Sequence, residues 1–123
     1  MTMLFEPRAG LGIDELEDEL ARAFECLRRA VLDGYSVVVA LDDTDVQGVG
    51  DVASAALAHG LLGLVRAFAL EGRKQGWRVS ALSSTADTDV TERVAWTEQL
   101  ADSRDAGGTL VRLGGQHLGR VAT

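Results

Sequence analysis

The sequence predicts a single α/β domain, built as a three-layer sandwich around a small, mainly parallel sheet. Apolar segments of strand length alternate with long segments of helical periodicity, which is the pattern of βαβ units. The run 36–41 is apolar at successive positions and β-branched at three of them, which is typical of a parallel strand buried on both faces. The 123 residues, 46% of them hydrophobic, are enough for one core, so we treat 1–123 as one domain.

The N-terminal segments predict a short strand followed by an amphipathic helix. Met3 to Phe5 form the strand, and the helix spans 14–33. Helical spacing relates the apolar positions of this helix: Leu16, Leu20, Ala23, Phe24, Leu27 and Val31. Asp14 and Glu17 have the spacing of a capping box, and Gly34 provides the stop signal.

A second long helix is predicted over 51–74, with Asp51 as its N-cap and Gly76 beyond its end. Its apolar run is broken at few positions, so the helix needs cover on most sides. Small residues form a stripe along it, at Ala56, Gly60, Gly63 and Ala67. The rest of the chain predicts a strand at 77–83, a helix at 89–102 and a strand at 109–113.

Composition excludes several classes of partner and setting. The net charge is −7, from twelve basic and nineteen acidic residues, which argues against binding to nucleic acid or an anionic membrane. The 51–74 helix contains His59 and Arg66 and is a poor membrane span. Cys26 is the only cysteine, and no signal peptide is recognised, so we expect a cytoplasmic protein. The strong preference for arginine over lysine favours a bacterial source.

Residues 54–71 carry a resemblance to a known family. The segment Ser54-Ala-Ala-Leu-Ala-His-Gly-Leu-Leu-Gly63-Leu-Val-Arg-Ala-Phe-Ala-Leu-Glu71 is similar to the active-site helix of short-chain dehydrogenases/reductases. The resemblance continues elsewhere in the chain, at Ala9-Gly10, 37–43, 78–82, 87–88 and 109–115. It covers nearly all of this chain and the C-terminal half of a family member. It implies a truncated, Rossmann-like fold that lacks the first nucleotide-binding half with its glycine-rich phosphate loop.

The catalytic groups of that family have no counterparts here. The resemblance places Ser54 where the family has its tyrosine and Ala58 where it has its lysine. Tyr35 and Lys74 are the only residues of their types, so no Tyr-x-x-x-Lys pair exists, and the chain has no asparagine. A hydroxymethyl and a methyl group cannot act as a phenol general acid and an ammonium that lowers its pKa.

Two patterns near the centre of the chain suggest ligand chemistry. Gly48-Val-Gly50-Asp-Val-Ala53 matches the dinucleotide fingerprint, but six residues, three of them acidic, separate it from the preceding strand. We interpret it as a loop before a helix. Asp42, Asp43 and Asp45 follow a parallel strand, where they form either a divalent-cation site or a solvated acidic turn that caps the next helix.

The histidines suggest no catalytic set by themselves. Ser54 and His59 lie five residues apart on one helix, point in different directions and cannot pair. We interpret His59 as a packing or interface residue and His117 as a solvated residue of the tail. A weak ligand site at Asp42, Asp43 and His59 is kept as an alternative.

We therefore expect a non-catalytic relative of the family that acts by association, without a cofactor or a metal. The partner is a second copy, giving a homodimer, or a full-length reductase that this chain serves as an accessory subunit, as cofactor-free subdomains serve polyketide ketoreductases. The resemblance implies an interface on the two long helices, at Phe24, Leu27, Val31, Ala56, Gly60, Gly63 and Ala67. The alternatives are half of a split NAD(P)-dependent ketoreductase completed by a partner chain, and a new activity around Asp42, Asp43 and His59.

Overall fold

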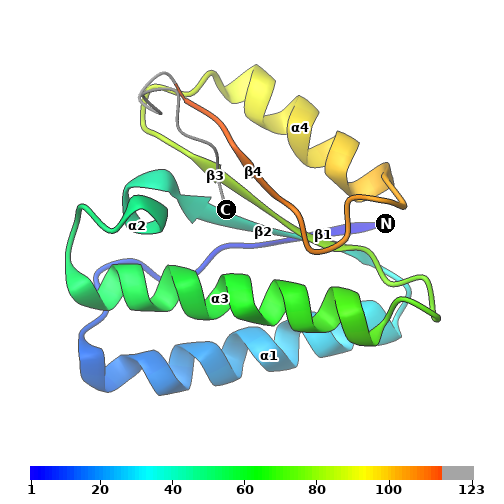
Figure 1. Ribbon diagram of the computed structural model, residues 1–123, viewed down its shortest axis with the longest axis horizontal. Coiled ribbons are helices and arrows are strands. Elements are labelled where there is room, and N and C mark those ends of the chain that lie inside the picture. Colours follow the sequence, from blue (N-terminus) through cyan, green and yellow to red (C-terminus); the bar gives the residue numbers. More distant parts are fainter. Residues whose placement is uncertain (115–123) are drawn as a thin grey trace.

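The computed structural model describes residues 1–114, and their centre is a four-stranded sheet in which all strands are parallel (Figure 1). The strand order follows the chain, β1-β2-β3-β4. The strands are β1 (Thr2–Phe5), β2 (Ser36–Asp42), β3 (Val79–Ser84) and β4 (Leu110–Arg112). The helices are a 3₁₀ turn η1 (Ile13–Glu15), α1 (Leu16–Leu32), α2 (Asp43–Gln47), α3 (Val52–Glu71) and α4 (Val90–Asp102).

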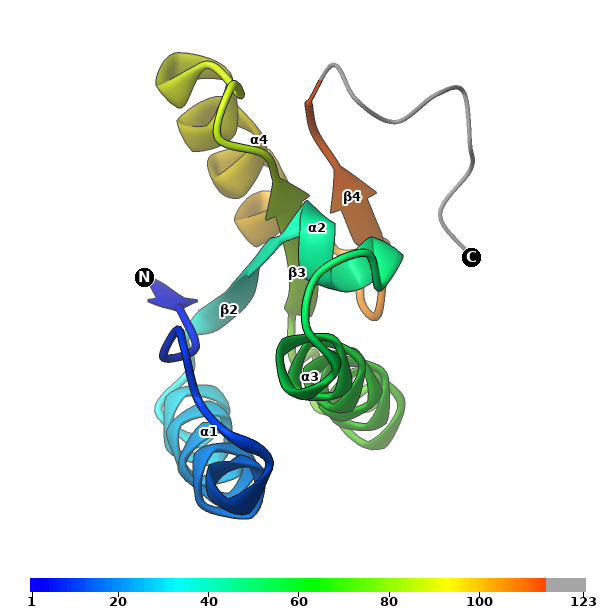
Figure 2. The same ribbon diagram turned by 90° about the vertical axis from the view of Figure 1, so that its left-hand side faces the viewer.

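Helices cover both faces of the sheet, which confirms the predicted α/β sandwich with a Rossmann-like parallel sheet. Helices α1 and α3 lie side by side on one face, and α4 lies on the other (Figure 2). The alternation of β2 serves both layers, because Val37 and Val39 join the core under α1 and α3 whereas Val38 packs with Leu100 of α4. All three valines are fully buried. The apolar run 36–41 is therefore explained by two cores.

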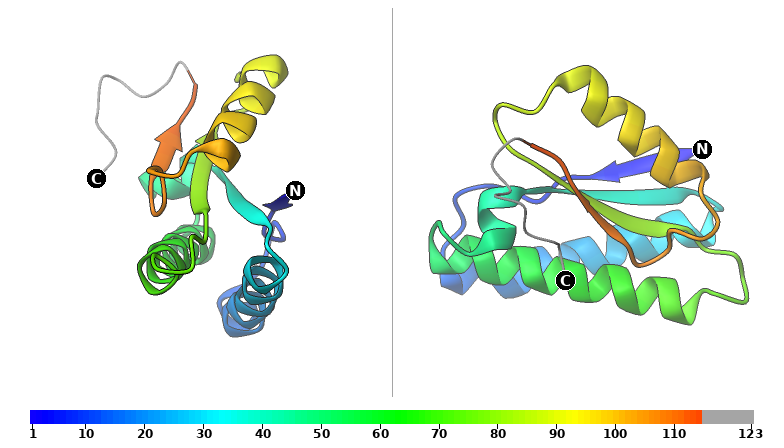
Figure 3. Two further views of the ribbon diagram at one scale, coloured as in Figure 1. Left: turned by 90° about the vertical axis from the view of Figure 1, so that its right-hand side faces the viewer. Right: turned by 45° about the horizontal axis from the view of Figure 1, so that its top comes forward.

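The connection through α4 has an unusual hand. Each strand is placed next to its predecessor in the same direction, and the crossovers through α1 and α3 are right-handed (Figure 2). Because α4 lies on the opposite face, the β3-α4-β4 crossover is left-handed, which is rare among such units (Figure 3). Helix α4 contacts β2 and β3, so the same face of β1 lacks a helix over it, and Leu4 remains 47% exposed.

The helix ends agree with most sequence signals but not with the predicted capping box. Asp51 accepts a hydrogen bond from the Ser54 backbone at 2.8 Å and caps α3, and Gly34, with φ 85°, follows the end of α1. The first helix begins differently. The Glu15 carboxylate accepts from the Gly12 N–H at 3.0 Å, so this contact lies two residues earlier than the predicted Asp14 and Glu17 pair. The 3₁₀ turn explains the shift, because it adds a turn before α1.

Residues 42–50 form more than the predicted acidic turn. Asp42 caps the short helix α2 through the Thr44 N–H at 2.8 Å, and Gly48 ends it in the left-handed conformation, with φ 75°. Asp42 thus caps α2 and not α3. The Gly48 and Gly50 pair lies in the connector between the two helices, as the interpretation of the fingerprint required.

Within the described residues, one helix, α3, is long and apolar enough to cross a membrane by length and composition. The core helix of a soluble protein meets the same criteria. Seven residues of α3 are buried against the chain's own sheet and neighbouring helix: Ala53, Leu57, Ala58, Leu61, Leu62, Val65 and Phe68. A core role therefore accounts for its composition.

Replacement of the α3 cap tests this assignment of helix starts. Asp51→Ala should lower the free energy of unfolding by about 1 kcal/mol, because the Ser54 N–H loses its acceptor. Asp14→Ala should change it by less than about 0.5 kcal/mol, because Asp14 is exposed and makes no side-chain cap. Urea denaturation followed by circular dichroism measures both. Equal losses would contradict the assignment.

Candidate functional site

A groove of about 670 Å³ lies over the carboxyl edge of the sheet, where parallel α/β proteins place ligands. Five segments distant in the sequence meet there: the loop after β1, the end of β2, the start of α3, the end of β3 and the N-terminal part of α4. Each segment ends or begins at this edge because all strands run the same way. Among the lining residues are Ala9, Gly10, Asp42, Ser54, Ala58 and Ser84.

These are positions that the resemblance relates to an active site, and their side chains offer little chemistry. Ser54 Oγ donates to the Asp51 carboxylate at 2.9 Å and so completes the α3 cap. Ala58 contributes a methyl group, is buried, and lies one turn further along the helix. Among residues 1–114, the groove lining has no histidine, cysteine, tyrosine or lysine. Its titratable acids are Glu6, Asp42, Asp45 and Glu98.

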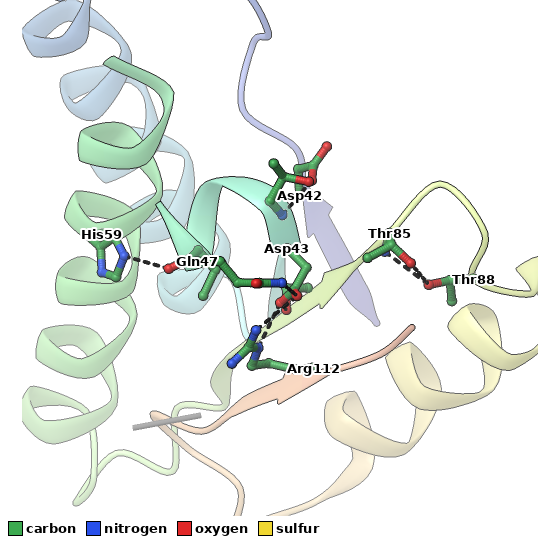
Figure 4. A network of polar contacts seen from close by, with 10 residues as sticks. Asp42, Asp43, Gln47, His59, Thr85, Thr88 and Arg112 are labelled. Atoms are coloured by element: carbon green, nitrogen blue, oxygen red, sulfur yellow. Dashed lines mark hydrogen bonds and ion pairs between the residues drawn. The ribbon is translucent and has the colours of Figure 1, made fainter. Parts of the chain in front are cut away.

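Below the groove, the carboxylate of Asp43 is the centre of a buried polar network (Figure 4). Arg112 Nε and Nη2 donate to its two oxygens at 2.8 and 3.0 Å, a bidentate ion pair between α2 and β4. Ser83 Oγ of β3 donates to Oδ1 at 2.8 Å, and Gln47 Nε2 donates to Oδ2 at 2.7 Å. Arg112 belongs to β4 and Ser83 to β3, whereas Gln47 lies one turn along α2 itself, so the network fixes α2 against the sheet.

The network sets the ionisation of Asp43. Burial raises the pKa of its carboxyl, but the hydrogen bonds from Arg112, Ser83 and Gln47 outweigh burial and lower the pKa to about 2. The opposite holds for Asp45, whose pKa is raised by burial and by the neighbouring Asp42 and Asp51 carboxylates. Asp43 is thus a permanently ionised structural group.

The candidate ligand set of Asp42, Asp43 and His59 is not assembled. His59 Nε2 lies 2.9 Å from the Val46 carbonyl oxygen, and Figure 4 shows it on the far side of α2 from Asp43. Asp42 is occupied as the α2 cap. Asp43 is neither solvated nor open to a cation, because Arg112 neutralises it. Among residues 1–114 no three His, Cys, Asp or Glu side chains are grouped to hold a metal ion, and His117 lies outside these residues.

The interface residues expected on the two long helices divide into two groups. Leu27 and Val31 are buried in the chain's own core, so they cannot contact a partner. Gly60 serves the α1–α3 contact, because a Cβ there would lie 3.0 Å from Leu20 Cδ2. The helical spacing indicated an apolar face correctly, but it did not distinguish the sheet from another chain as its cover.

The other group lies on the outer surface, where α3 exposes an apolar face away from the sheet. Ala56, Gly63 and Ala67 are exposed, and Phe24 of α1 is 43% exposed. Val52 and Leu70, which sequence reasoning did not single out, extend this face with exposed fractions of 75% and 70%. We call these six residues the α3 face. His59 and Arg66 are exposed on the same side of α3. Small and apolar residues make up the rest of this side, which is uncommon for a surface helix.

Two buried ion pairs escaped sequence reasoning, one because its members are far apart in the chain and the other because a local Glu–Arg spacing does not reveal burial. Arg112 lies 69 residues after Asp43, and nothing local relates them. Glu19 is only 1% exposed and pairs with Arg22 at 2.7 Å. It also accepts from the Arg8 N–H at 2.7 Å, which ties the rim of the groove to α1. The pKa of Glu19 is lowered, first by the Arg22 hydrogen bond.

The sequence matches no protein-family model, and it has no significant match among curated proteins.

The pH dependence of stability tests the Asp43 network. The folded pKa of about 2 lies below the ordinary value of 3.8, so its contribution is complete above about pH 5 and is lost as the pH falls toward 2. Asp43→Asn should be less stable than the wild type at pH 7. The difference in free energy of unfolding between the wild type and Asp43→Asn should shrink by about 2 kcal/mol on acidification. Urea denaturation across this range measures it, with the exposed Glu25→Gln as the matched control. A constant gap for Asp43→Asn would refute the ion-pair account.

Proposed function

We propose that this chain is a non-catalytic relative of the short-chain dehydrogenases/reductases, a cytoplasmic protein that acts by association through the α3 face. The observation that carries the proposal is the exposed apolar surface of a helix whose opposite side is already buried in the core. Two observations support the family relationship. One is the sheet topology, and the other is that a single groove brings together Ala9-Gly10, Asp42, Ser54 and Ala58.

The composition of the α3 face suits close helix packing with a second copy. Three small residues follow one line of the helix and allow another helix to approach closely, namely Ala56, Gly63 and Ala67. Val52 and Leu70 add apolar area at the two ends of this line. A twofold axis beside such a line brings each helix against its own counterpart and makes one patch complementary to itself. Phe24 of α1 extends the contact toward a four-helix arrangement, as the family resemblance implies.

The chemistry of the groove supports the non-catalytic part of the proposal. The positions related to the catalytic tyrosine and lysine carry a helix-capping serine and a buried alanine. Asp42, the last residue of β2, caps α2, and the neighbouring Asp43 is neutralised by Arg112. Removal of one essential acid or base alone commonly costs ~10² to 10⁴ in rate.

A split ketoreductase is the second candidate, and the position of β1 favours it. β1 pairs only with β2 among the described residues, so its other edge presents backbone N–H and C=O groups for a further strand. Leu4 is half exposed beside this edge, at one end of the groove. A partner chain that supplies the nucleotide-binding half would extend the sheet there and enclose the groove.

Self-association is tested by light scattering at tens of micromolar. The wild type should have the mass of a dimer, and Gly63→Leu should be mainly monomeric, because a leucine would hold the paired helices apart. A Cβ at Gly63 meets no described atom within 4 Å, so the folded chain tolerates the substitution. Glu92→Leu, exposed on α4 across the sheet, adds the same side chain as a control and should remain dimeric. A monomeric wild type would contradict the proposal.

Cofactor and turnover assays test the non-catalytic part. The isolated chain should give no saturable heat with millimolar NAD(H) or NADP(H) that depends on the 48–50 loop, and it should not oxidise NADPH in the presence of ketones. A saturable heat that Gly50→Asp abolishes would refute this expectation. Addition of a reductase encoded by a neighbouring gene separates the candidates, since activity that only the mixture shows identifies a split enzyme. An accessory subunit should bind the reductase without being required for its turnover.

A further inference from the structure

A second cavity, of about 1000 Å³, lies at the opposite end of the sheet from the groove. Its walls come from the end of α3, the loop that leads into β3 and the loop that leads into β4. Four arginines line it, Arg66, Arg73, Arg78 and Arg104, and the only acidic side chain in the lining is Asp105. A chain of net charge −7 with eleven arginines thus places four of them around one cavity.

Three of these arginines, Arg73, Arg78 and Arg104, keep most of their guanidinium donors available. Arg78 Nη1 donates to the Asp102 carbonyl oxygen at 3.4 Å, a long contact that leaves most of its donors available. Arg73 and Arg104 are exposed and have no ion pair or side-chain hydrogen bond with residues 1–114. Arg73 and Arg104 each lie two residues beyond a helix C-terminus, α3 and α4 respectively, and their guanidinium donors face no acceptor in residues 1–114. The cavity therefore retains an excess of positive charge.

The rest of the lining permits a ligand to approach. Gly76 and Gly108 have φ of 76° and 80°, and their backbone is not screened by a side chain. Trp77 is half buried and packs on Phe68 with the ring centroids 6.2 Å apart, so one part of its indole is fixed at the cavity wall. Ala69 and Leu70 add apolar surface beside it. The volume is at the upper end of that found for small-molecule pockets.

From these observations we propose that the cavity binds a small molecule with an oligophosphate group. The planar guanidinium presents paired N–H donors that match phosphate oxygens, and several arginines together match several phosphates. One carboxylate would neutralise a single charge and leave the others repelling one another. The arginines surround a cavity and do not form a stripe, which favours a small molecule over a nucleic acid. Trp77 offers a stacking surface for an aromatic group on the same ligand.

Isothermal titration with tripolyphosphate at low ionic strength tests the proposal. We expect saturable one-to-one binding that weakens as salt is added. Arg73→Glu/Arg104→Glu should weaken it by a factor of a hundred or more, since each lost arginine contact is worth roughly tenfold or more. Arg73→Lys/Arg104→Lys keeps the charge without the paired donors and should lose about tenfold. Arg28→Glu, exposed on α1 away from the cavity, should remain within about threefold of the wild type.

A second measurement locates the ligand and identifies its source. In Trp96→Phe, Trp77 is the only tryptophan, and its emission should change on titration. If ATP binds more tightly than tripolyphosphate, the ligand is a nucleotide with its base on Trp77. If the two affinities are equal, the cavity recognises the phosphates alone. No heat at millimolar tripolyphosphate would overturn the proposal. So would full binding by the glutamate variant, an equal loss in Arg28→Glu, or equally tight binding of a polyglutamate peptide.

Discussion

The buried carboxylate of Asp43 is the interaction on which the carboxyl edge of this protein depends. Helix α2 has five residues and β4 has three, lengths at which neither element is stable alone. The bidentate contact with Arg112 joins these two weak elements, and Ser83 attaches both to β3. An ionised group without access to water requires all of its partners. The same charge that would be costly in isolation therefore specifies one arrangement of α2, β3 and β4.

A second buried carboxylate performs a related role at the other edge of the sheet. Glu19 of α1 accepts from Arg22 on its own helix and from the Arg8 backbone in the loop after β1. That loop forms the rim of the groove, next to Ala9 and Gly10. Each wall of the groove is thus held in place by a buried carboxylate that an arginine neutralises, and neither carboxylate lines the groove. The groove is therefore held by rigid supports on both sides.

Helix α3 links the core to the surface that we propose for association. One side supplies seven core residues, and the opposite side carries mainly small and apolar residues, with His59 and Arg66 among them. The left-handed crossover through α4 has a separate effect. It places α4 over β2 and β3 and leaves β1 without a helix on that face, which opens the groove. The groove and the α3 face meet at the N-terminal end of α3, where Ser54 and Ala58 line the groove and Val52 and Ala56 are exposed.

The sequence alone determined the α/β class, the four strands, the three long helices and most of their ends. Those features follow from local signals, namely periodicity, Asp caps and glycine stops, which act within a few residues. Tertiary structure alone decided which apolar faces were covered. It buried Leu27 and Val31 in the core and left Phe24, Val52 and Leu70 exposed. It also decided the hand of the last crossover, the pairing of Asp43 with Arg112 and the convergence of four arginines. Each of these depends on contacts between segments far apart in the chain, and no local pattern encodes which segments meet.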